Sequence, residues 1–292
     1  MSATTTNTDT AAPPRTGTAA GHAGFGSAFA FELRKLRAQV RTKALLAGAL
    51  IAPVPIALAI HAQGNPPRDT LFGRYATTNG FSLALLVLGY AAQWLLPLMT
   101  AIVAGDIFAS EDHHGTWKTI LTRSVSRSSF FAAKTVAALG FAVVVVLLLG
   151  FSTIVSSVVI GGHGDLTGLT GQVIPAHEAW RLVSASWLSV IAPTIAFTGL
   201  AVLFSVWSRS VAVGVATPVV LAMMMQLVGA MGGAEALRPY LPTTAYEAWH
   251  GFLASPAFSG LFTAGLVTCA VWTALTLGVS WTILRRRDIT GG

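Results

Sequence analysis

The chain has 292 residues, of which 53% are hydrophobic and only 10% are charged. A soluble domain carries about 25% charged residues, so this composition excludes an ordinary soluble domain and indicates an integral membrane protein. The formal net charge is +7. Because the basic residues lie at the ends of apolar segments and not on one soluble face, this charge indicates membrane topology and no nucleic-acid partner.

The first 43 residues divide into two parts. Residues 1–24 are rich in Thr, Ala, Gly and Pro without a periodic apolar pattern, which predicts a disordered cytoplasmic tail. Residues 25–43 predict an amphipathic interface helix with Arg and Lys on its polar surface. Its apolar face has spacings of four, three and four residues and consists of Phe29, Leu33, Leu36 and Val40. A basic amphipathic helix before a spanning segment is expected to lie flat on the cytoplasmic interface of the bilayer.

Residues 44–292 are predicted to form an all-α transmembrane domain with six spans. A helix needs about 20 residues to cross a bilayer. The six candidates are residues 44–60, 81–104, 135–160, 182–206, 211–230 and 261–284. Prolines interrupt four of them, which a membrane helix tolerates where neighbouring helices or water satisfy the freed carbonyls.

The distribution of Lys and Arg over the loops predicts the orientation of the spans. With both termini in the cytoplasm, fourteen basic residues lie inside and four lie outside; the four are Arg68, Arg74, Arg181 and Arg238. The predicted protein is a multi-pass protein of the cytoplasmic membrane. Its bias toward Ala, Gly, Val and Arg is typical of a bacterium with GC-rich DNA.

Residues 231–260 form the longest predicted extracytoplasmic segment. This segment mixes Trp, Tyr, Phe and Leu with Pro and Gly, so it is neither a span nor an ordinary polar loop. Short interfacial or re-entrant helices before the last span are expected here.

The segment 105–134, between the second and third spans, is predicted to be cytoplasmic and contains the polar run EDHHGTWKTILTRSVSR. The run EDHH at 111–114 offers metal-ligating side chains, but consecutive residues of a helix point in different directions and cannot converge on one ion. We therefore expect no metal site in the chain.

The second half of this run predicts a short amphipathic helix with Trp117, Ile120 and Leu121 as an apolar triplet. Ser126 is expected to cap the next helix, which carries Lys134 into the third span. The residues alone leave two interpretations open. The segment is either an interfacial loop whose positive charges only set the topology, or a docking element for another protein.

No catalytic constellation is apparent. None of the four lysines follows a glycine, so the chain lacks the GxxxxGK[ST] loop that binds nucleotide phosphates and is not expected to be an enzyme. An intramembrane protease would need a nucleophile facing a base. Asp106 and Ser152 are the nearest candidates and are better explained as an interface residue and a helix-packing hydroxyl.

Taken in order, these motifs resemble the permease subunits of type-2 ABC exporters. Their second cytoplasmic segment has an acidic pair, Gly-Thr, paired Leu, a Pro-x-Ser-Arg turn and a Lys that enters the third span. The matching residues here are Glu111-Asp112, Gly115-Thr116, Ile120-Leu121, Val125-Ser126-Arg127 and Lys134. Ser124 stands where the family usually has proline. The amphipathic entry helix, the six spans and the sequence YLPTTAYEAWHG also resemble the family.

This resemblance implies a permease that binds no cofactor itself, with ATP and Mg²⁺ on two separate ABC ATPase subunits. It further implies a pore formed with a second copy or a homologous permease, and an amphipathic cargo such as a lipid, drug or natural product. The residues implied in ATPase docking and coupling are Glu111, Asp112, Gly115, Thr116, Trp117, Ile120, Leu121, Arg123, Arg127 and Lys134. The alternatives are a six-span secondary transporter or membrane scaffold without an ATPase partner, and an intramembrane enzyme.

Overall fold

The computed structural model describes residues 24–63, 70, 72–113, 115 and 126–287 of the chain. Within this part, six helical segments are long and apolar enough to cross a membrane, which confirms the prediction of an all-α membrane protein with six spans. They are Val40–Ala62, Gly80–His113, Arg127–Gly161, Ala176–Ser208, Val211–Ala230 and Gly260–Arg286. The predicted tail, residues 1–24, lies outside the described residues except for Gly24.

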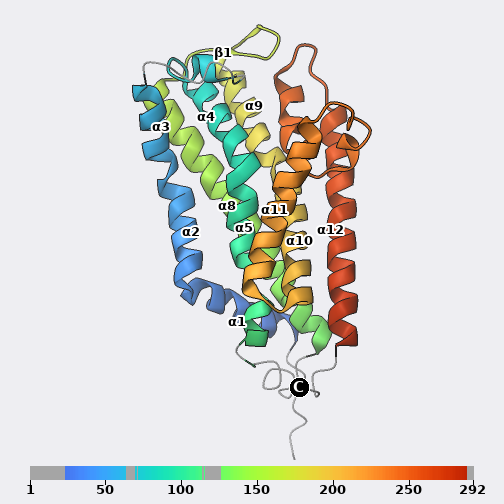
Figure 1. Cartoon of the computed structure of the whole chain (residues 1–292). Coiled ribbons are helices and arrows are strands. Elements are labelled where there is room, and N and C mark those ends of the chain that lie inside the picture. The colour runs from blue at the N-terminus through green and yellow to red at the C-terminus, as the bar shows by residue number, and fades with distance from the viewer. Residues whose placement is uncertain (1–23, 64–69, 71, 114, 116–125, 288–292) are drawn as a thin grey trace, which may run out of the picture.

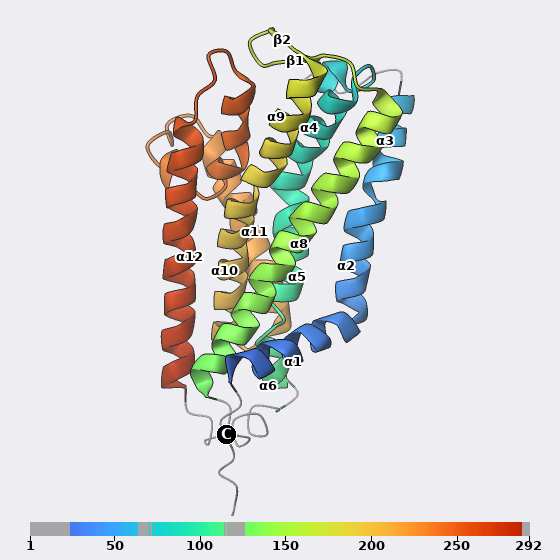
Figure 2. The ribbon, with the colours of Figure 1, turned by 180° about the vertical axis from the view of Figure 1, so that it is seen from behind.

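The spans run side by side as one bundle, and α1 (Phe25–Ala38) crosses one end of it (Figures 1 and 2). We call this end, where the last turn of α12 (Gly260–Arg286) also lies, the terminal end of the bundle. The opposite end, which carries the hairpin and the 3₁₀ helices, is called the loop end.

Three of the six spans contain more than one helical element, and each has proline close to a junction. Proline has no N–H to donate and its ring crowds the preceding turn, so it favours a break or a change of helical register. The first span consists of α2 (Val40–Ile51) and α3 (Pro53–Ala62). The second consists of α4 (Gly80–Tyr90), the π-helical turn η2 (Ala91–Leu95), α5 (Leu96–Ala104) and α6 (Ala109–His113). The fourth consists of α9 (Ala176–Ser189) and α10 (Ile191–Ser208).

The predicted interface helix over residues 25–43 is in fact two helices. The α1 helix ends at Ala38, Gln39 has an extended backbone with ψ 127°, and α2 begins at Val40. The reason is local: the Gln39 N–H donates to the last carbonyls of α1, and its side-chain oxygen accepts from the Thr42 hydroxyl in the first turn of α2. Val40 is therefore not part of the interface helix but the 81% exposed first residue of a span.

The third span is a single helix, α8 (Arg127–Gly161). Its first turn is capped by Ser126, whose Oγ accepts from the Ser129 N–H at 3.1 Å, as the sequence predicted. As predicted, the helix that Ser126 caps carries Lys134, which lies about two turns from the start of α8.

Short elements close the loop end of the bundle. An antiparallel hairpin joins the third and fourth spans and pairs Leu166 with Ile174. The segment before the last span folds into 3₁₀ helices, and Tyr246, Trp249 and Leu253 bury their side chains against the bundle. The bounds are β1 (Leu166–Thr167), β2 (Val173–Ile174), η1 (Gly73–Tyr75), η3 (Arg238–Tyr240) and η4 (Thr244–Leu253).

The spans differ in how far their neighbours cover them. The second and fourth spans are 61% and 72% buried over their most apolar stretch, against 17%, 17% and 11% for the first, fifth and last. The second and fourth spans therefore form the core, and the single helices α11 (Val211–Ala230) and α12 expose wide apolar faces. In a membrane protein such faces contact lipid or another membrane protein.

Candidate functional site

A fully buried lysine lies where α1, α6 and α8 meet at the terminal end. Lys134 of α8 is 0% exposed, and its Nζ lies 2.8 Å from Oε1 of Glu111 and 2.8 Å from Oε1 of Glu32. The contact with Glu111 is a hydrogen bond, while Glu32 makes an ion pair without hydrogen-bond geometry. A buried ammonium is tolerated only where opposite charges and polar contacts compensate for lost hydration.

The charges of this cluster balance. Lys35 of α1 also donates to Glu111, so two carboxylates face two ammonium groups. The rings of Phe130 and Phe108 lie 4.9 and 5.9 Å from Lys134 Nζ and present their π-faces to the cation. We call Glu32, Lys35, Glu111 and Lys134 the buried charge cluster. It joins α6 and α8 to α1, which is far from both in the sequence.

The polypeptide from Gly105 to His113, which we call the hub segment, is bound to further helices. Asp106 pairs with Arg41 at the start of α2. The hydroxyl of Ser205 in α10 accepts from the N–H groups of Phe108 and Ala109 at 3.1 and 3.0 Å. These bonds satisfy backbone donors where the second span leaves its helical register, and they tie the segment to the core.

The end of α12 is bound to the same region. Arg287 Nη2 lies 3.0 Å from Asp112 Oδ1. Burial lowers the pKa of Arg287, and the neighbouring Asp112 opposes this shift. Arg127, the first residue of α8, donates to the carbonyls of Arg285 and Arg287 at 3.1 and 3.2 Å, which satisfies carbonyls left free at the helix end. The hub segment is thus connected to five other helices.

The structure brings several predicted coupling residues together. Glu111 and Asp112 lie in α6 and pair with α8 and α12, and Gly115 follows α6 with a left-handed φ of +62°. Arg127 and Lys134 lie on α8 at the same end. Five others, Thr116, Trp117, Ile120, Leu121 and Arg123, lie outside the described residues.

The face of α1 that packs on the bundle differs from the predicted one. Leu36 is buried as expected, and Phe29 and Leu33 are half-buried, but Glu32 is buried beside them. Hydrophobic periodicity assigns a carboxylate to the polar side of a helix, so sequence reasoning missed Glu32. The one available signal was that Glu32 is the single acid in a strongly basic helix.

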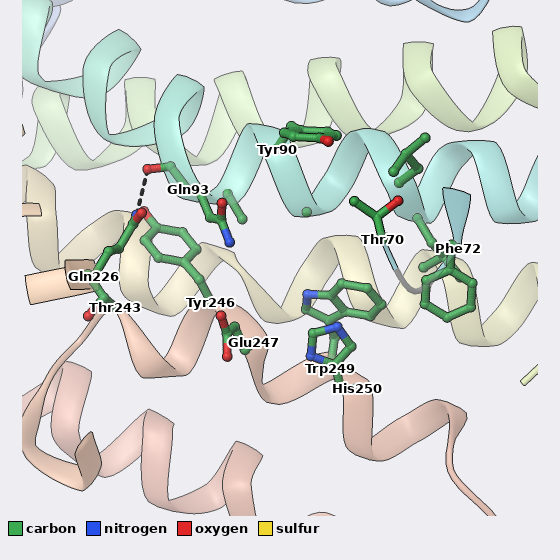
Figure 3. Close-up of a pocket in the computed structure, with 14 residues that line it drawn as sticks. Thr70, Phe72, Tyr90, Gln93, Gln226, Thr243, Tyr246, Glu247, Trp249 and His250 are labelled. Atoms are coloured by element: carbon green, nitrogen blue, oxygen red, sulfur yellow. Dashed lines mark hydrogen bonds between the residues drawn. The ribbon is translucent and has the colours of Figure 1, made fainter. Parts of the chain in front are cut away.

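Two cavities lie near the loop end, between the middle of the second span, the end of α11 and the η3–η4 segment. Figure 3 shows the residues that line the smaller one. Their volumes are about 230 and 640 Å³. Residues from all three walls line both cavities: Gln93, Gln226, Thr243 and Glu247. Gln226 Nε2 of α11 donates to the Gln93 carbonyl at 2.6 Å and links two of these walls (Figure 3).

Two side chains of the smaller cavity have shifted pKa values. Burial lowers the pKa of His250 although Glu247 opposes the shift, so the imidazole is neutral at physiological pH. Burial also raises the pKa of Tyr246, whose hydroxyl lies 3.3 Å from Thr194 Oγ1. The wall from η4 therefore contributes neutral aromatic groups, and Glu247 is its charged group.

Comparison with known proteins identifies the family. The model of the family described as "ABC-2 family transporter protein" matches residues 28–229, well over half of the chain. Comparison with curated proteins gave no match. The matched region includes most of α1, nearly all of the first five spans, the buried charge cluster and the hub segment. The chain therefore belongs to the ABC-2 transporter family, as a permease whose family membership implies an ABC ATPase partner.

Proposed function

We propose that the chain is the permease of an ATP-driven exporter in a bacterial cell membrane and that it exports an amphipathic molecule. Two copies, or one copy and a homologous permease, form the translocation path. Two separate ATPase subunits bind ATP and Mg²⁺ and dock on the cytoplasmic segment 105–134. The chain itself performs no catalysis. The observation that carries this proposal is the hub segment, which lies within the proposed docking segment and is bound to α1, α2, α8, α10 and the end of α12.

The proposed orientation places the terminal end in the cytoplasm, where ATP is available. Arg34, Lys35, Arg37 and Arg41 lie at this end, as do Arg285 and Arg286 at the last turn of α12. An excess of Lys and Arg in short loops marks the cytoplasmic side of membrane proteins.

The coupling follows from the connections of the hub segment. When the ATPase subunits close, they push on the docking region. The hub segment transmits this push to α8 through Lys134, to α1 through Lys35 and to α12 through Arg287. Buried ion pairs depend strongly on geometry, so these helices move as a unit and do not slide past one another. Gln39 supplies a bend at which α1 can turn relative to the first span.

The first test is the composition of the purified complex. Affinity-tagged chain, extracted in mild detergent from its native cells, is expected to bring down a polypeptide that contains GxxxxGK[ST] and hydrolyses ATP. Mass spectrometry and an ATPase assay measure this. If the chain purifies alone and transports in vesicles under an ion gradient, the secondary-transporter alternative replaces the proposal.

The second test addresses the buried charge cluster. Replacing Lys35 with glutamine removes the partly exposed Lys35–Glu111 ion pair and leaves the buried Lys134–Glu111 pair in place. We expect transport-coupled ATP hydrolysis to fall about ten-fold while membrane insertion and ATPase co-purification persist, since a loss of about 1.4 kcal/mol in coupling corresponds to that factor. The matched control is Lys43→Gln, an exposed position in α2. Equal hydrolysis in Lys35→Gln and in the wild type would exclude the cluster from coupling.

A further inference from the structure

The larger cavity is lined by two opposite charges that do not pair with each other. Arg238 of η3 and Glu247 of η4 both line it. Within the described part of the chain, neither forms a salt bridge. The Arg238 Nε is buried, and no described residue accepts a hydrogen bond from it. A buried guanidinium N–H without an acceptor costs free energy, so a bound anionic group would stabilise it.

The Glu247 carboxylate lies on another part of the η3–η4 wall that also carries Arg238. Glu247 comes from η4, and Gln93 of the opposite wall lines the same two cavities (Figure 3). The neighbouring His250 has a lowered pKa and is neutral, so it does not neutralise this carboxylate. Two opposite charges that share a cavity without forming an ion pair leave room for a ligand that carries both complementary charges.

The rim of this cavity is apolar. Trp94 of η2 and Met223, Met224 and Leu227 of α11 line it, and all four side chains are at least 42% exposed. Methionine side chains are flexible and adapt to apolar chains of different shapes. Gln93, Gln226 and Thr243 supply hydrogen-bonding groups to the lining of this cavity.

We propose that this cavity binds a zwitterionic amphiphile, and that this is the class of molecule that the permease carries. The anionic group of the ligand accepts from Arg238, its ammonium group pairs with Glu247, and its apolar chain lies along Trp94, Met223 and Leu227. The assignment of the ligand as cargo rests on the proposed transport function. The binding itself does not, because it follows from the cavity alone.

The test measures binding to the purified full-length chain in micelles of an uncharged detergent, without the ATPase. The probe is lysophosphatidylcholine with a brominated chain, which quenches tryptophan fluorescence on contact. We expect it to bind at least about ten-fold more tightly than two brominated amphiphiles of equal chain length, an alkyl phosphate and an alkyl trimethylammonium, since each of these leaves one charge of the cavity unpaired. Phosphocholine without a chain is expected to compete only weakly.

Variants separate the two charges. Glu247→Gln and Arg238→Gln are each expected to weaken lysophosphatidylcholine binding about ten-fold, and Arg238→Lys is expected to retain the preference for the zwitterion. The matched controls, Glu235→Gln in the same loop and Arg181→Gln on α9, are expected to bind as the wild type, because both positions are exposed and line neither cavity. Size-exclusion elution confirms that each variant is folded.

Three outcomes would overturn the proposal. The first is that the alkyl phosphate binds as tightly as the zwitterion and that its binding depends on Arg238 alone. The second is that all variants bind lysophosphatidylcholine equally. The third is that a second copy of the chain covers the rim and excludes the probe. If the chain purifies with an ATPase but does not bind the probe, the proposed permease function stands and the zwitterion site is refuted. If the chain binds the probe but has no ATPase partner, the zwitterion site stands and the proposed permease function is refuted.

Discussion

Replacing Lys134 with methionine is expected to destabilise the protein by about 3–5 kcal/mol, the cost of removing one partner from a buried ion pair. Two carboxylates, Glu32 and Glu111, would remain buried beside an uncharged side chain. Lys35 would still pair with Glu111, but Glu32 would lose its one described ion-pair partner. Thermal unfolding of the purified protein in detergent, followed by tryptophan fluorescence, measures the loss.

Two further variants make this prediction specific. The triple variant Lys134→Met, Glu32→Gln, Glu111→Gln removes the uncompensated charges and is expected to recover much of the lost stability, because apolar or neutral groups of similar shape replace an ion pair at little cost. Lys43→Met, at an exposed position of α2, is expected to have little effect. If Lys134→Met unfolds at the wild-type temperature, the cluster does not hold α1 and α6 against α8.

Replacing Gly105 with alanine is expected to separate the second and fifth spans. A Cβ atom at this position would lie 2.4 Å from the carbonyl carbon and oxygen of Gly214 in α11, which are backbone atoms that cannot rotate away. The φ of Gly105 is −66°, so the backbone conformation is ordinary and the cost comes from the contact alone. Forcing an extra methyl group into packed helices costs about 1–3 kcal/mol, so the unfolding temperature and transport are both expected to fall.

The matched control for this variant is Gly140→Ala in α8. A Cβ atom there meets nothing within 4 Å. An alanine inside a helix is more stable than a glycine by about 0.5–1 kcal/mol, so this control is expected to raise the unfolding temperature slightly. Opposite signs for the two substitutions would confirm that the close approach of α5 and α11, and not helix propensity, decides the result. Equal effects would contradict it.

The hub segment begins at Gly105, where the end of α5 touches α11, and lies within the proposed docking segment. A displacement at the hub segment therefore reaches the fifth span through backbone contact and the third span through Lys134. The two loop-end cavities lie between those same second and fifth spans.

The sequence by itself determined the number of spans and the family. Long apolar runs predict spanning helices because the bilayer core requires about 20 apolar residues and internal backbone hydrogen bonds, which is a local requirement. The order of short motifs around Glu111, Gly115 and Lys134 was sufficient for the resemblance to type-2 ABC permeases, and the family match confirms it. The cap at Ser126 was also readable, since capping depends on neighbours within one turn.

Only the tertiary structure decided which charged side chains are buried and which residues are their ion-pair partners. Glu32 and Asp106 have no local feature that predicts a partner, because their partners, Lys134 and Arg41, are many residues away in the chain. The end of the interface helix at Ala38 depends on hydrogen bonds to the Gln39 side chain, which apolar periodicity does not register. Arg238 and Glu247 are ordinary loop charges in the sequence, and only the packing of η3 against α12 and of η4 against α9 and α12 makes them part of one cavity wall. Ion pairs between distant residues depend on how the helices pack against one another. The apolar periodicity of a single helix carries no information about that packing.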